Sequence, residues 1–202
     1  MSIRAIVVDF YDVLYREKDS AQLRAFEQKH DLPEGGLRYA LARSRYFRDA
    51  RLGTVSGETL WRDVAERIGV SPDEWRTLVT LYESGFGLNE ELVAFLHVLH
   101  ARYPIALLSN ATRHIRALMT QRFHLSHLFD VIVISAEEGV KKPEPEIYER
   151  TLLRLKVPAQ QAVFVDDSPS YIQAAQSLGM AGIVFHTTEQ VITDIRRLLE
   201  RD

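Results

Sequence analysis

Short apolar runs recur along the chain, and five of them have the length and the β-branched content of buried strands. The segments around the last four of these runs carry apolar residues at helical spacing instead. Strands that alternate with helices in this way form a parallel sheet covered by helices on both faces. The pattern therefore predicts a doubly wound α/β fold. The predicted strands are residues 3–8, 105–108, 131–134, 162–165 and 182–185, and the predicted helices are residues 90–101, 112–123, 145–155, 170–178 and 188–201.

The stretch from residue 16 to residue 87 interrupts this alternation. It contains no comparable apolar run and has the pattern of several amphipathic helices. Ser71, Pro72 and Glu74 mark one helix start, because they supply a capping serine, a proline at the first helical position and a glutamate at the third. We therefore expect a helical domain at residues 16–87, inserted into a core domain formed by residues 1–15 and 88–202.

Composition and charge exclude several classes of protein and of metal site. The formal net charge is −3, so no basic surface is expected that would attract nucleic acid. The chain contains no cysteine, so a bound metal would need oxygen or histidine ligands. No apolar run approaches the roughly 20 residues that cross a membrane, and the first residues lack the pattern of a signal peptide. We expect a cytoplasmic protein without membrane or nucleic-acid partners.

Polar residues follow four of the predicted strands at the point where each strand ends. Asp9 follows the first strand, Ser109 and Asn110 follow the second, Ser135 follows the third, and Asp166 and Asp167 follow the fourth. In an open parallel sheet the carboxyl ends of the strands meet at one edge, and ligands bind there. Each residue alone would be ordinary capping or turn chemistry. Their coincidence at one edge indicates a functional site.

Four motifs contain these residues apart from Ser135. They are Asp-Phe-Tyr-Asp-Val-Leu at 9–14, Leu-Leu-Ser-Asn at 107–110, Gly-Val-Lys-Lys-Pro at 139–143 and Val-Phe-Val-Asp-Asp-Ser at 163–168. In this order they resemble the motifs of the haloacid dehalogenase superfamily, and the resemblance spans essentially the whole chain and implies a Rossmann-like core. The insertion directly after the first motif is similar to the helical cap of one subgroup. Residues 47–61 resemble small sugar-phosphate phosphatases and the amino-terminal domain of epoxide hydrolases.

The resemblance implies a Mg²⁺-dependent phosphohydrolase that acts on a small phosphorylated metabolite. Asp9 would be the nucleophile and would form an aspartyl-phosphate. A hard cation prefers oxygen ligands, and Asp9, the backbone carbonyl of Tyr11, Asp166 and Asp167 would supply them. Lys142 would neutralise both the nucleophile and the phosphate. The residues that would bind the phosphate are Ser109, Asn110 and Lys142.

One position departs from the superfamily pattern. Most of its phosphatases carry a second aspartate two residues after the nucleophile, where it acts as acid and base, and this chain has Tyr11 there, followed by Asp12. Three readings stay open: a phosphatase that works without that acid, a 2-haloacid dehalogenase, or an impaired relative that binds a phosphorylated ligand or a partner protein. Asp166 and Asp167 favour phosphate chemistry over dehalogenation, because an acidic pair needs a compensating cation.

Substrate identity would be set by residues of the helical insertion, and no general pattern decodes them. Arg43, Arg45 and Arg48 lie in that insertion and are candidate contacts for a phosphate or a sugar. A basic helix face is more often simply solvated. The oligomeric state leaves no clear mark in the sequence.

Overall fold

A five-stranded parallel sheet forms the centre of the protein, whose computed structural model describes residues 2–200. The strand order is β5-β4-β1-β6-β7. Each strand matches a predicted run to within two residues, so the predicted doubly wound parallel sheet is confirmed. The strands are β1 (Ala5–Val8), β4 (Ile105–Ser109), β5 (Val131–Ile134), β6 (Ala162–Asp166) and β7 (Ala181–Val184).

The first strand is the central one, and its register brings the ends of its neighbours together. Val8 of β1 lies beside Leu107 of β4 on one side and Val165 of β6 on the other. All three strands run in the same direction, so the residues that follow them emerge at the same edge of the sheet. This edge therefore collects the polar residues that follow the predicted strands in the sequence.

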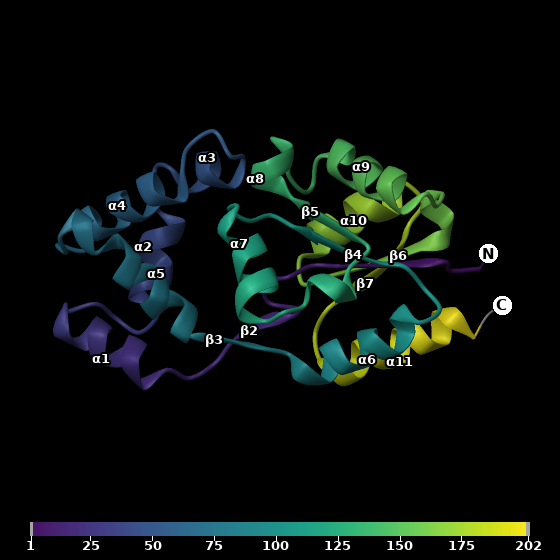
Figure 1. Ribbon diagram of the computed structural model, residues 1–202, viewed down its shortest axis with the longest axis horizontal. Coiled ribbons are helices and arrows are strands. Elements are labelled where there is room, and N and C mark those ends of the chain that lie inside the picture. Colours follow the sequence, from purple (N-terminus) through teal and green to yellow (C-terminus); the bar gives the residue numbers. More distant parts are fainter. Residues whose placement is uncertain (1, 201–202) are drawn as a thin grey trace.

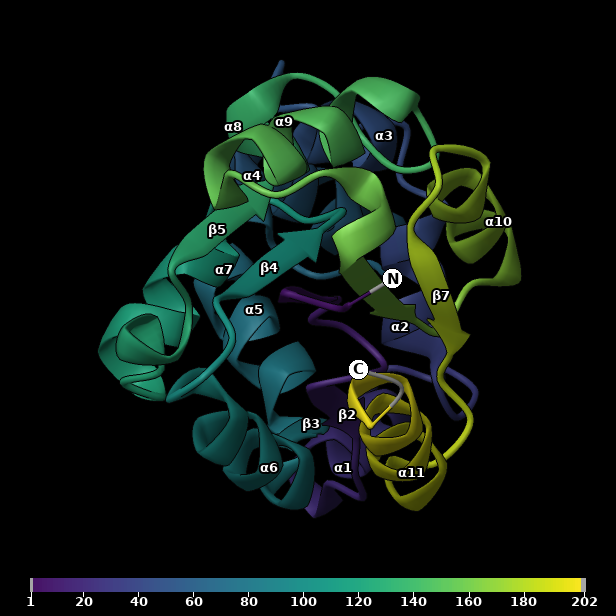
Figure 2. The ribbon, with the colours of Figure 1, turned by 90° about the vertical axis from the view of Figure 1, so that its right-hand side faces the viewer.

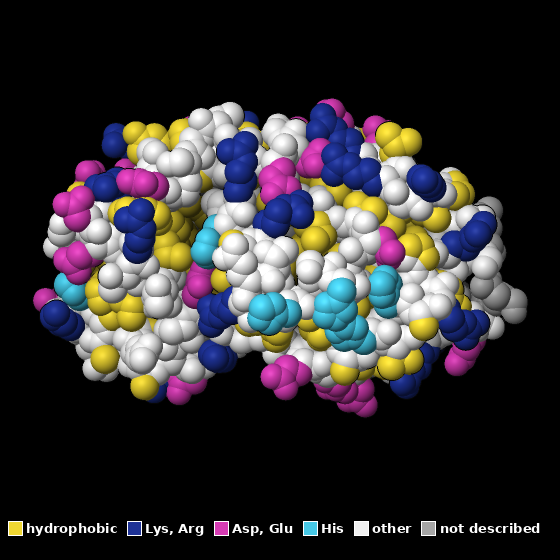
Figure 3. Space-filling view, viewed as in Figure 1, with side chains coloured by type: hydrophobic (Ala, Val, Ile, Leu, Met, Phe, Trp, Pro, Cys, Tyr) yellow, Lys and Arg dark blue, Asp and Glu magenta, His cyan; other side chains and the backbone are white. Residues whose placement is uncertain are grey.

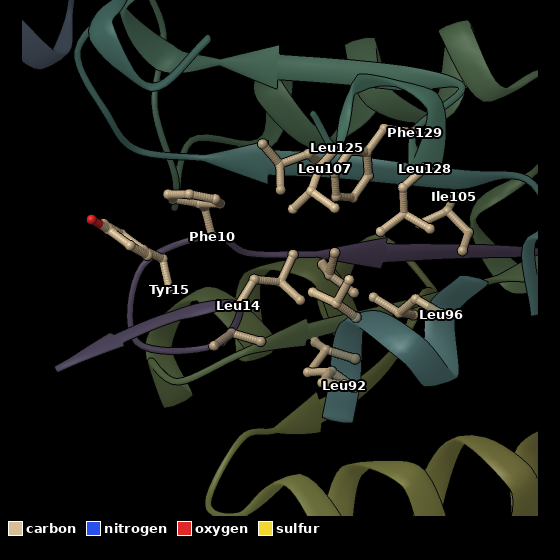
Figure 4. Packing of buried hydrophobic residues seen from close by; sticks show 14 of the residues in the cluster. Phe10, Leu14, Tyr15, Leu92, Leu96, Ile105, Leu107, Leu125, Leu128 and Phe129 are labelled. Atoms are coloured by element: carbon tan, nitrogen blue, oxygen red, sulfur yellow. The ribbon is translucent and has the colours of Figure 1, made fainter. Parts of the chain in front are cut away.

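Helices cover both faces of the sheet, as Figures 1 and 2 show. Successive side chains of a strand point to opposite faces, so Ile6 and Val8 pack in one apolar cluster and Ala5 and Val7 in another. Figure 4 shows the first cluster, in which Leu92 and Leu96 belong to a covering helix. That face carries α6 (Glu90–His100) and α11 (Thr188–Leu199), and the other carries α9 (Pro145–Leu155) and α10 (Pro169–Ser177).

The predicted helix at 112–123 is shorter and wider than expected. It begins as α7 (His114–Ala117) and continues as a π-helical segment, Leu118–Arg122, in which the amide of Phe123 bonds to the carbonyl of Leu118. The Thr120 hydroxyl donates to the carbonyl of Arg116, which gives that carbonyl a side-chain partner. The remaining short elements are α8 (Ser135–Glu138) and the 3₁₀ turns Ser126–Leu128 and Ala159–Gln161.

The segment between β1 and α6 forms a separate helical layer, on the left of Figure 1. Leu37, Leu60, Val64 and Leu78 are almost fully buried in its own apolar cluster. No helix within residues 2–200 is both long and apolar enough to span a membrane. The helices of this layer are α1 (Ala21–Lys29), α2 (Gly36–Ala42), α3 (Phe47–Arg51), α4 (Gly57–Arg67) and α5 (Trp75–Ser84).

Two features of the helical layer differ from expectation. Ser71 caps a 3₁₀ turn, Pro72–Glu74, that leads into α5, so the α-helix itself begins one residue after the turn. A two-stranded antiparallel ribbon, β2 (Tyr15–Glu17) with β3 (Phe86–Leu88), joins the layer to the rest of the chain. The sequence did not predict this ribbon, because three residues are too few to reveal an alternating pattern.

Candidate active site

A buried cluster of charged side chains lies at the carboxyl edge of the sheet. Asp9 follows β1, and Asp166 ends β6. One carboxylate oxygen from each of Asp9, Asp166 and Asp167 lies within 4.8 Å of the others. The ammonium of Lys142 lies 3.0 Å from Asp9 Oδ1 and 2.6 Å from Asp166 Oδ2. The fold thus brings together four of the predicted site residues, of which only Asp167 is exposed.

The cluster holds more negative than positive charge. Burial raises the pKa of Asp166 to about 7, and Asp9 adds to the effect, although Lys142 opposes it. Burial, Asp9 and Asp12 likewise raise the pKa of Asp167. Burial alone would lower the pKa of Lys142, but Asp9 and Asp166 reverse this and raise it. The pKa of each of these three groups is therefore shifted toward the protonated form, as expected where buried carboxylates outnumber the cations beside them.

The donor set also suits a hard cation. Mg²⁺ takes oxygen ligands and is usually held by one or two carboxylates, and Asp9, Asp166 and Asp167 present carboxylate oxygens within reach of one ion. A divalent ion would offset the excess negative charge that raises the pKa values of Asp166 and Asp167. The residues present therefore fit the metal that the sequence resemblance implies.

Lys142 is fully buried and is held from several sides. Its ammonium also donates to the carbonyl of Leu108 at 3.1 Å. The rings of Phe164 and Tyr171 lie 5.3 and 5.2 Å from it, within the range of cation–π attraction. These contacts fix the ammonium between Asp9 and Asp166.

Asn110 is tied to Lys142 rather than facing outward. Its Nδ2 donates to the carbonyl of Lys142 at 2.9 Å, and the Lys142 amide donates back to Asn110 Oδ1 at 2.8 Å. The carbonyl of Asn110 accepts a hydrogen bond from Arg51 Nε at 2.9 Å. The side chain of Asn110 therefore positions the lysine.

Ser109 ends β4 and is almost completely buried. Its hydroxyl is the one buried side-chain polar atom within residues 2–200 that has no hydrogen-bond partner. Buried polar groups are nearly always paired. An unpaired hydroxyl at this edge of the sheet is suited to bind an oxygen of a ligand.

Tyr11 lies two residues after Asp9, the candidate nucleophile, and packs among other aromatic rings. Its ring lies 5.4 Å from that of Phe10 and 5.9 Å from that of Phe86. Burial raises the pKa of the Tyr11 hydroxyl well above its usual value, and Tyr82 adds to this effect. The hydroxyl therefore stays protonated and cannot serve as a base.

Asp12 occupies a strained position beside this tyrosine. Its φ angle of 62° lies in the left-handed region, which disfavours most residues other than glycine and tolerates aspartate. Asp12 Oδ2 accepts a hydrogen bond from the guanidinium of Arg38 at 3.1 Å. Since Arg38 belongs to α2, this bond connects the helical layer to the edge of the sheet.

A cavity of about 300 Å³ lies between the helical layer and this edge. Arg38 and Arg51 line it, together with Tyr11, Asp12 and Asn110. The arginines suggested by the sequence do not line it. Arg45 pairs with Asp63 at 3.1 Å, and the guanidinium of Arg43 rests over the ring of Tyr39. No sequence signal distinguished these arginines, because the packing of the helical layer decides which of them face the cavity.

Comparisons with known proteins agree with this geometry. Phosphoserine phosphatase of Thermus thermophilus is 27% identical over 131 residues, which cover 62% of this chain and 53% of the relative. Sesquiterpene phosphatase astK of Aspergillus oryzae is 40% identical over 74 residues, 36% of this chain and 37% of the relative. In eight of the curated relatives, the matched part spans between 9% and 53% of the relative's length.

A solved structure of similar shape is that of a HAD-family enzyme from Bacteroides thetaiotaomicron in complex with magnesium and inorganic phosphate. It aligns with a TM-score of 0.75 at 20% identity, over 92% of this chain and 95% of that one, and the likeness shows the shared fold. The model of the haloacid dehalogenase-like hydrolase family matches residues 3–179. The chain therefore belongs to the haloacid dehalogenase-like hydrolases.

Proposed function

We propose that the protein is a Mg²⁺-dependent phosphohydrolase that cleaves a small phosphomonoester through an aspartyl-phosphate on Asp9. The observation that carries the proposal is the buried cluster of Asp9, Lys142, Asp166 and Asp167, whose excess negative charge favours a cation. A phosphatase needs this arrangement, because an anionic nucleophile must approach an anionic phosphate. Phosphatases among the relatives support the same chemistry.

Asp9, Asp166 and Asp167 would hold the metal, with the backbone carbonyl of Tyr11 as a further ligand. When bound, Mg²⁺ would supply positive charge to the phosphate oxygens and to the carboxylates. The magnesium and phosphate bound to the related Bacteroides thetaiotaomicron enzyme support this assignment.

The protein's own groups account for the binding of the phosphate. The Lys142 ammonium, 3.0 Å from Asp9, places a positive charge beside the nucleophile and the phosphate. The unpaired hydroxyl of Ser109 and the backbone amide of Asn110 would donate to phosphate oxygens. Each of these groups strengthens its hold as charge develops on the phosphoryl group.

The reaction would proceed in two displacements. A carboxylate oxygen of Asp9 attacks phosphorus, the ester P–O bond breaks, and the leaving oxygen departs as an anion or takes a proton from water. Water then attacks phosphorus, the bond to Asp9 breaks, and phosphate and the free carboxylate are released. Tyr11 offers only a weakly acidic hydroxyl, so the proton for the leaving group comes from water or is not needed. We therefore expect the highest rates with leaving groups of low basicity.

The test is hydrolysis of p-nitrophenyl phosphate with and without Mg²⁺, by the wild type and by Asp9→Asn. Mg²⁺-dependent release of phosphate that is lost in Asp9→Asn supports the proposal. Release of phosphate by both proteins at the same rate would overturn it, as would the absence of release from any phosphomonoester.

One observation favours a second candidate, 2-haloacid dehalogenation. Tyr11 stands where such dehalogenases also carry tyrosine. Asp166 and Asp167 weigh against this activity. Dehalogenases work without a metal, so no cation would balance the negative charge of this acidic pair. Chloride release from 2-chloropropionate without Mg²⁺ would establish the dehalogenase. Binding of phosphate without any turnover would instead identify an impaired relative.

A further inference from the structure

Two cavities adjoin between the helical layer and the edge of the sheet. The inner cavity, of about 300 Å³, reaches Tyr11 and Asn110, which lie close in sequence to Asp9 and Ser109 of the proposed phosphate site. The outer cavity, of about 470 Å³, is lined by residues of α3, α4 and α5 and by the loop before α7. Both have the size of ordinary ligand pockets. They share four lining residues, Trp61, Val79, Thr112 and His114, so the two cavities lie side by side.

The walls of both cavities are mainly apolar. The space-filling view shows a hollow between the helical layer and the rest of the protein, with apolar side chains on the side of the layer (Figure 3). An apolar wall selects apolar ligands, since such surface gains by leaving water. Apart from the shared residues, the apolar lining consists of Leu41, Ala42, Phe47, Leu60, Phe86 and Ala111 in the inner cavity and Ala50, Val55 and Trp75 in the outer one.

Most of the charged groups at these walls already have partners. Arg38 pairs with Asp12 and with Glu17. Glu83 pairs with His114 and with Arg122. A sugar bound here would bring several hydroxyl groups against walls that are mainly apolar, and buried hydroxyl groups without a partner weaken binding. The apolar walls therefore favour an apolar tail over a sugar.

Three arginines at these walls, Arg51, Arg76 and Arg113, form no ion pair with a carboxylate among residues 2–200. Of these only Arg51 lines the inner cavity, so its charge lies near the proposed phosphate site. Arg51 Nε donates to the carbonyl of Asn110, and the Arg51 guanidinium lies 5.0 Å from the ring centre of Phe47. Arg51 does not line the outer cavity.

We infer that the substrate is the phosphomonoester of an elongated apolar hydroxyl compound. Its phosphate lies at Asp9, Ser109 and Lys142, and its apolar tail runs past Trp61 into the outer cavity. The inference rests on the proposed function and narrows it to a substrate class. It also replaces the sugar phosphate that the resemblance of residues 47–61 suggested.

The test uses phosphates that differ only in the tail. A series of 4-alkylphenyl phosphates from methyl to octyl keeps the leaving group constant, and a phenyl phosphate with a glucosyl group at the same position supplies a polar tail. We expect kcat/KM to rise by up to about fourfold for each added methylene that is buried, and the glucosyl compound to be about tenfold or more below the hexyl compound. A flat series, or a faster glucosyl compound, would overturn the inference.

A pair of variants locates the tail. Val55→Trp fills the outer cavity, and we expect it to lower the ratio of kcat/KM between the octyl and ethyl compounds about tenfold. Val98→Trp makes the same exchange on the exposed face of α6, away from both cavities, and serves as the control. An equal effect of both variants on the ratio, or no effect of Val55→Trp, would contradict the assignment of the outer cavity.

A binding measurement separates this inference from the proposed function. Absence of hydrolysis of every compound would overturn the phosphatase, and the tail would then be tested by titration alone. Both tryptophans of the chain, Trp61 and Trp75, line these cavities, so their fluorescence reports occupancy. Tighter binding of octyl phosphate than of ethyl phosphate supports the inference, and equal binding contradicts it.

Discussion

Asn110 and Lys142 bind each other through two hydrogen bonds. The side-chain Nδ2 of Asn110 donates to the backbone carbonyl of Lys142, and the backbone amide of Lys142 donates to Asn110 Oδ1. The two residues belong to separate motifs, one after β4 and one in the loop that follows α8. This pair of hydrogen bonds holds the backbone of Lys142 in place, and the Lys142 ammonium then reaches Asp9 and Asp166. The side chain of Asn110 thus supports the lysine, whereas the contact of this residue with phosphate stays a prediction for its backbone amide.

Asn110→Ala should therefore damage both stability and turnover. The change leaves a buried amide and a buried carbonyl of Lys142 without partners, which costs about 1–3 kcal/mol of unfolding free energy. It also frees the loop that carries the ammonium, so kcat should fall more than KM rises. Urea denaturation and steady-state kinetics measure the two effects.

Thr187→Ala is the control for this variant. It removes the cap of α11, where Thr187 accepts from the amide of Gln190, and should cost about 1 kcal/mol of unfolding free energy far from the motif loops. Its kcat should equal that of the wild type. If Asn110→Ala retained full kcat, Asn110 would have no part in positioning Lys142.

The stabilisation of the protein by Mg²⁺ should grow with pH. The pKa of Asp166 is raised to about 7, above its value of roughly 3.9 in an unfolded chain. Between these values the folded metal-free protein binds more protons than the unfolded one, so its stability falls as pH rises. Metal binding requires the deprotonated carboxylate and releases the proton. Thermal unfolding with and without Mg²⁺ should therefore show a larger increase in Tm at pH 8 than at pH 5.5.

Asp166→Asn should reduce this Mg²⁺ effect and its dependence on pH. The amide keeps the shape of the side chain but carries no charge and does not titrate. A Tm increase that is larger at pH 5.5 than at pH 8 in the wild type would contradict the assignment of Asp166 as a metal ligand.

Gly53 lies where the helical layer touches the rest of the protein. Its φ angle is +73°, and a Cβ at this residue would lie 2.0 Å from the carbonyl oxygen of Ala136. Next to it, the Ser135 hydroxyl donates to the carbonyl of Arg51 at 2.6 Å. Gly53→Ala should push the layer away from α8 and lower kcat/KM for p-nitrophenyl phosphate about tenfold or more, because small displacements of positioned groups reduce rates strongly.

Gly69→Ala separates this contact from backbone strain. Gly69 has a φ angle of +71°, but a Cβ at this residue would meet no atom within 4 Å, so it shares the strain without the contact. Both variants should lose about 1 kcal/mol of unfolding free energy from the left-handed conformation. Only Gly53→Ala should lose activity, and equal activities would show that the contact has no role.

Much of the fold and the main cluster follow from the sequence, because both depend on burial. The apolar runs report which strands are covered on both faces, and a parallel sheet then brings the residues after β1, β4 and β6 to one edge. The ribbon β2–β3, the cavity role of Arg51 and the bond between Asn110 and Lys142 depend instead on how distant segments pack. Local pattern carries no information on such packing.

Tyr11→Asp should restore the acid that this position usually supplies. General acid–base catalysis contributes about 10²- to 10⁴-fold, and its benefit is largest for strongly basic leaving groups. The ratio of kcat for phenethyl phosphate to kcat for p-nitrophenyl phosphate should therefore rise. Tyr11→Phe keeps the ring among Phe10 and Phe86 and should leave the ratio as it is. An unchanged ratio in Tyr11→Asp would show that a proton donor at this position does not limit the rate.

The most direct test of the account is to trap phosphate on Asp9. The wild type is mixed with radiolabelled p-nitrophenyl phosphate and Mg²⁺, quenched in acid within one turnover and assayed for label on the protein. We predict label that hydroxylamine removes, that requires Mg²⁺ and that is absent from Asp9→Asn. Phosphate release by the wild type without any labelled protein, or label that persists in Asp9→Asn, would contradict Asp9 as the nucleophile.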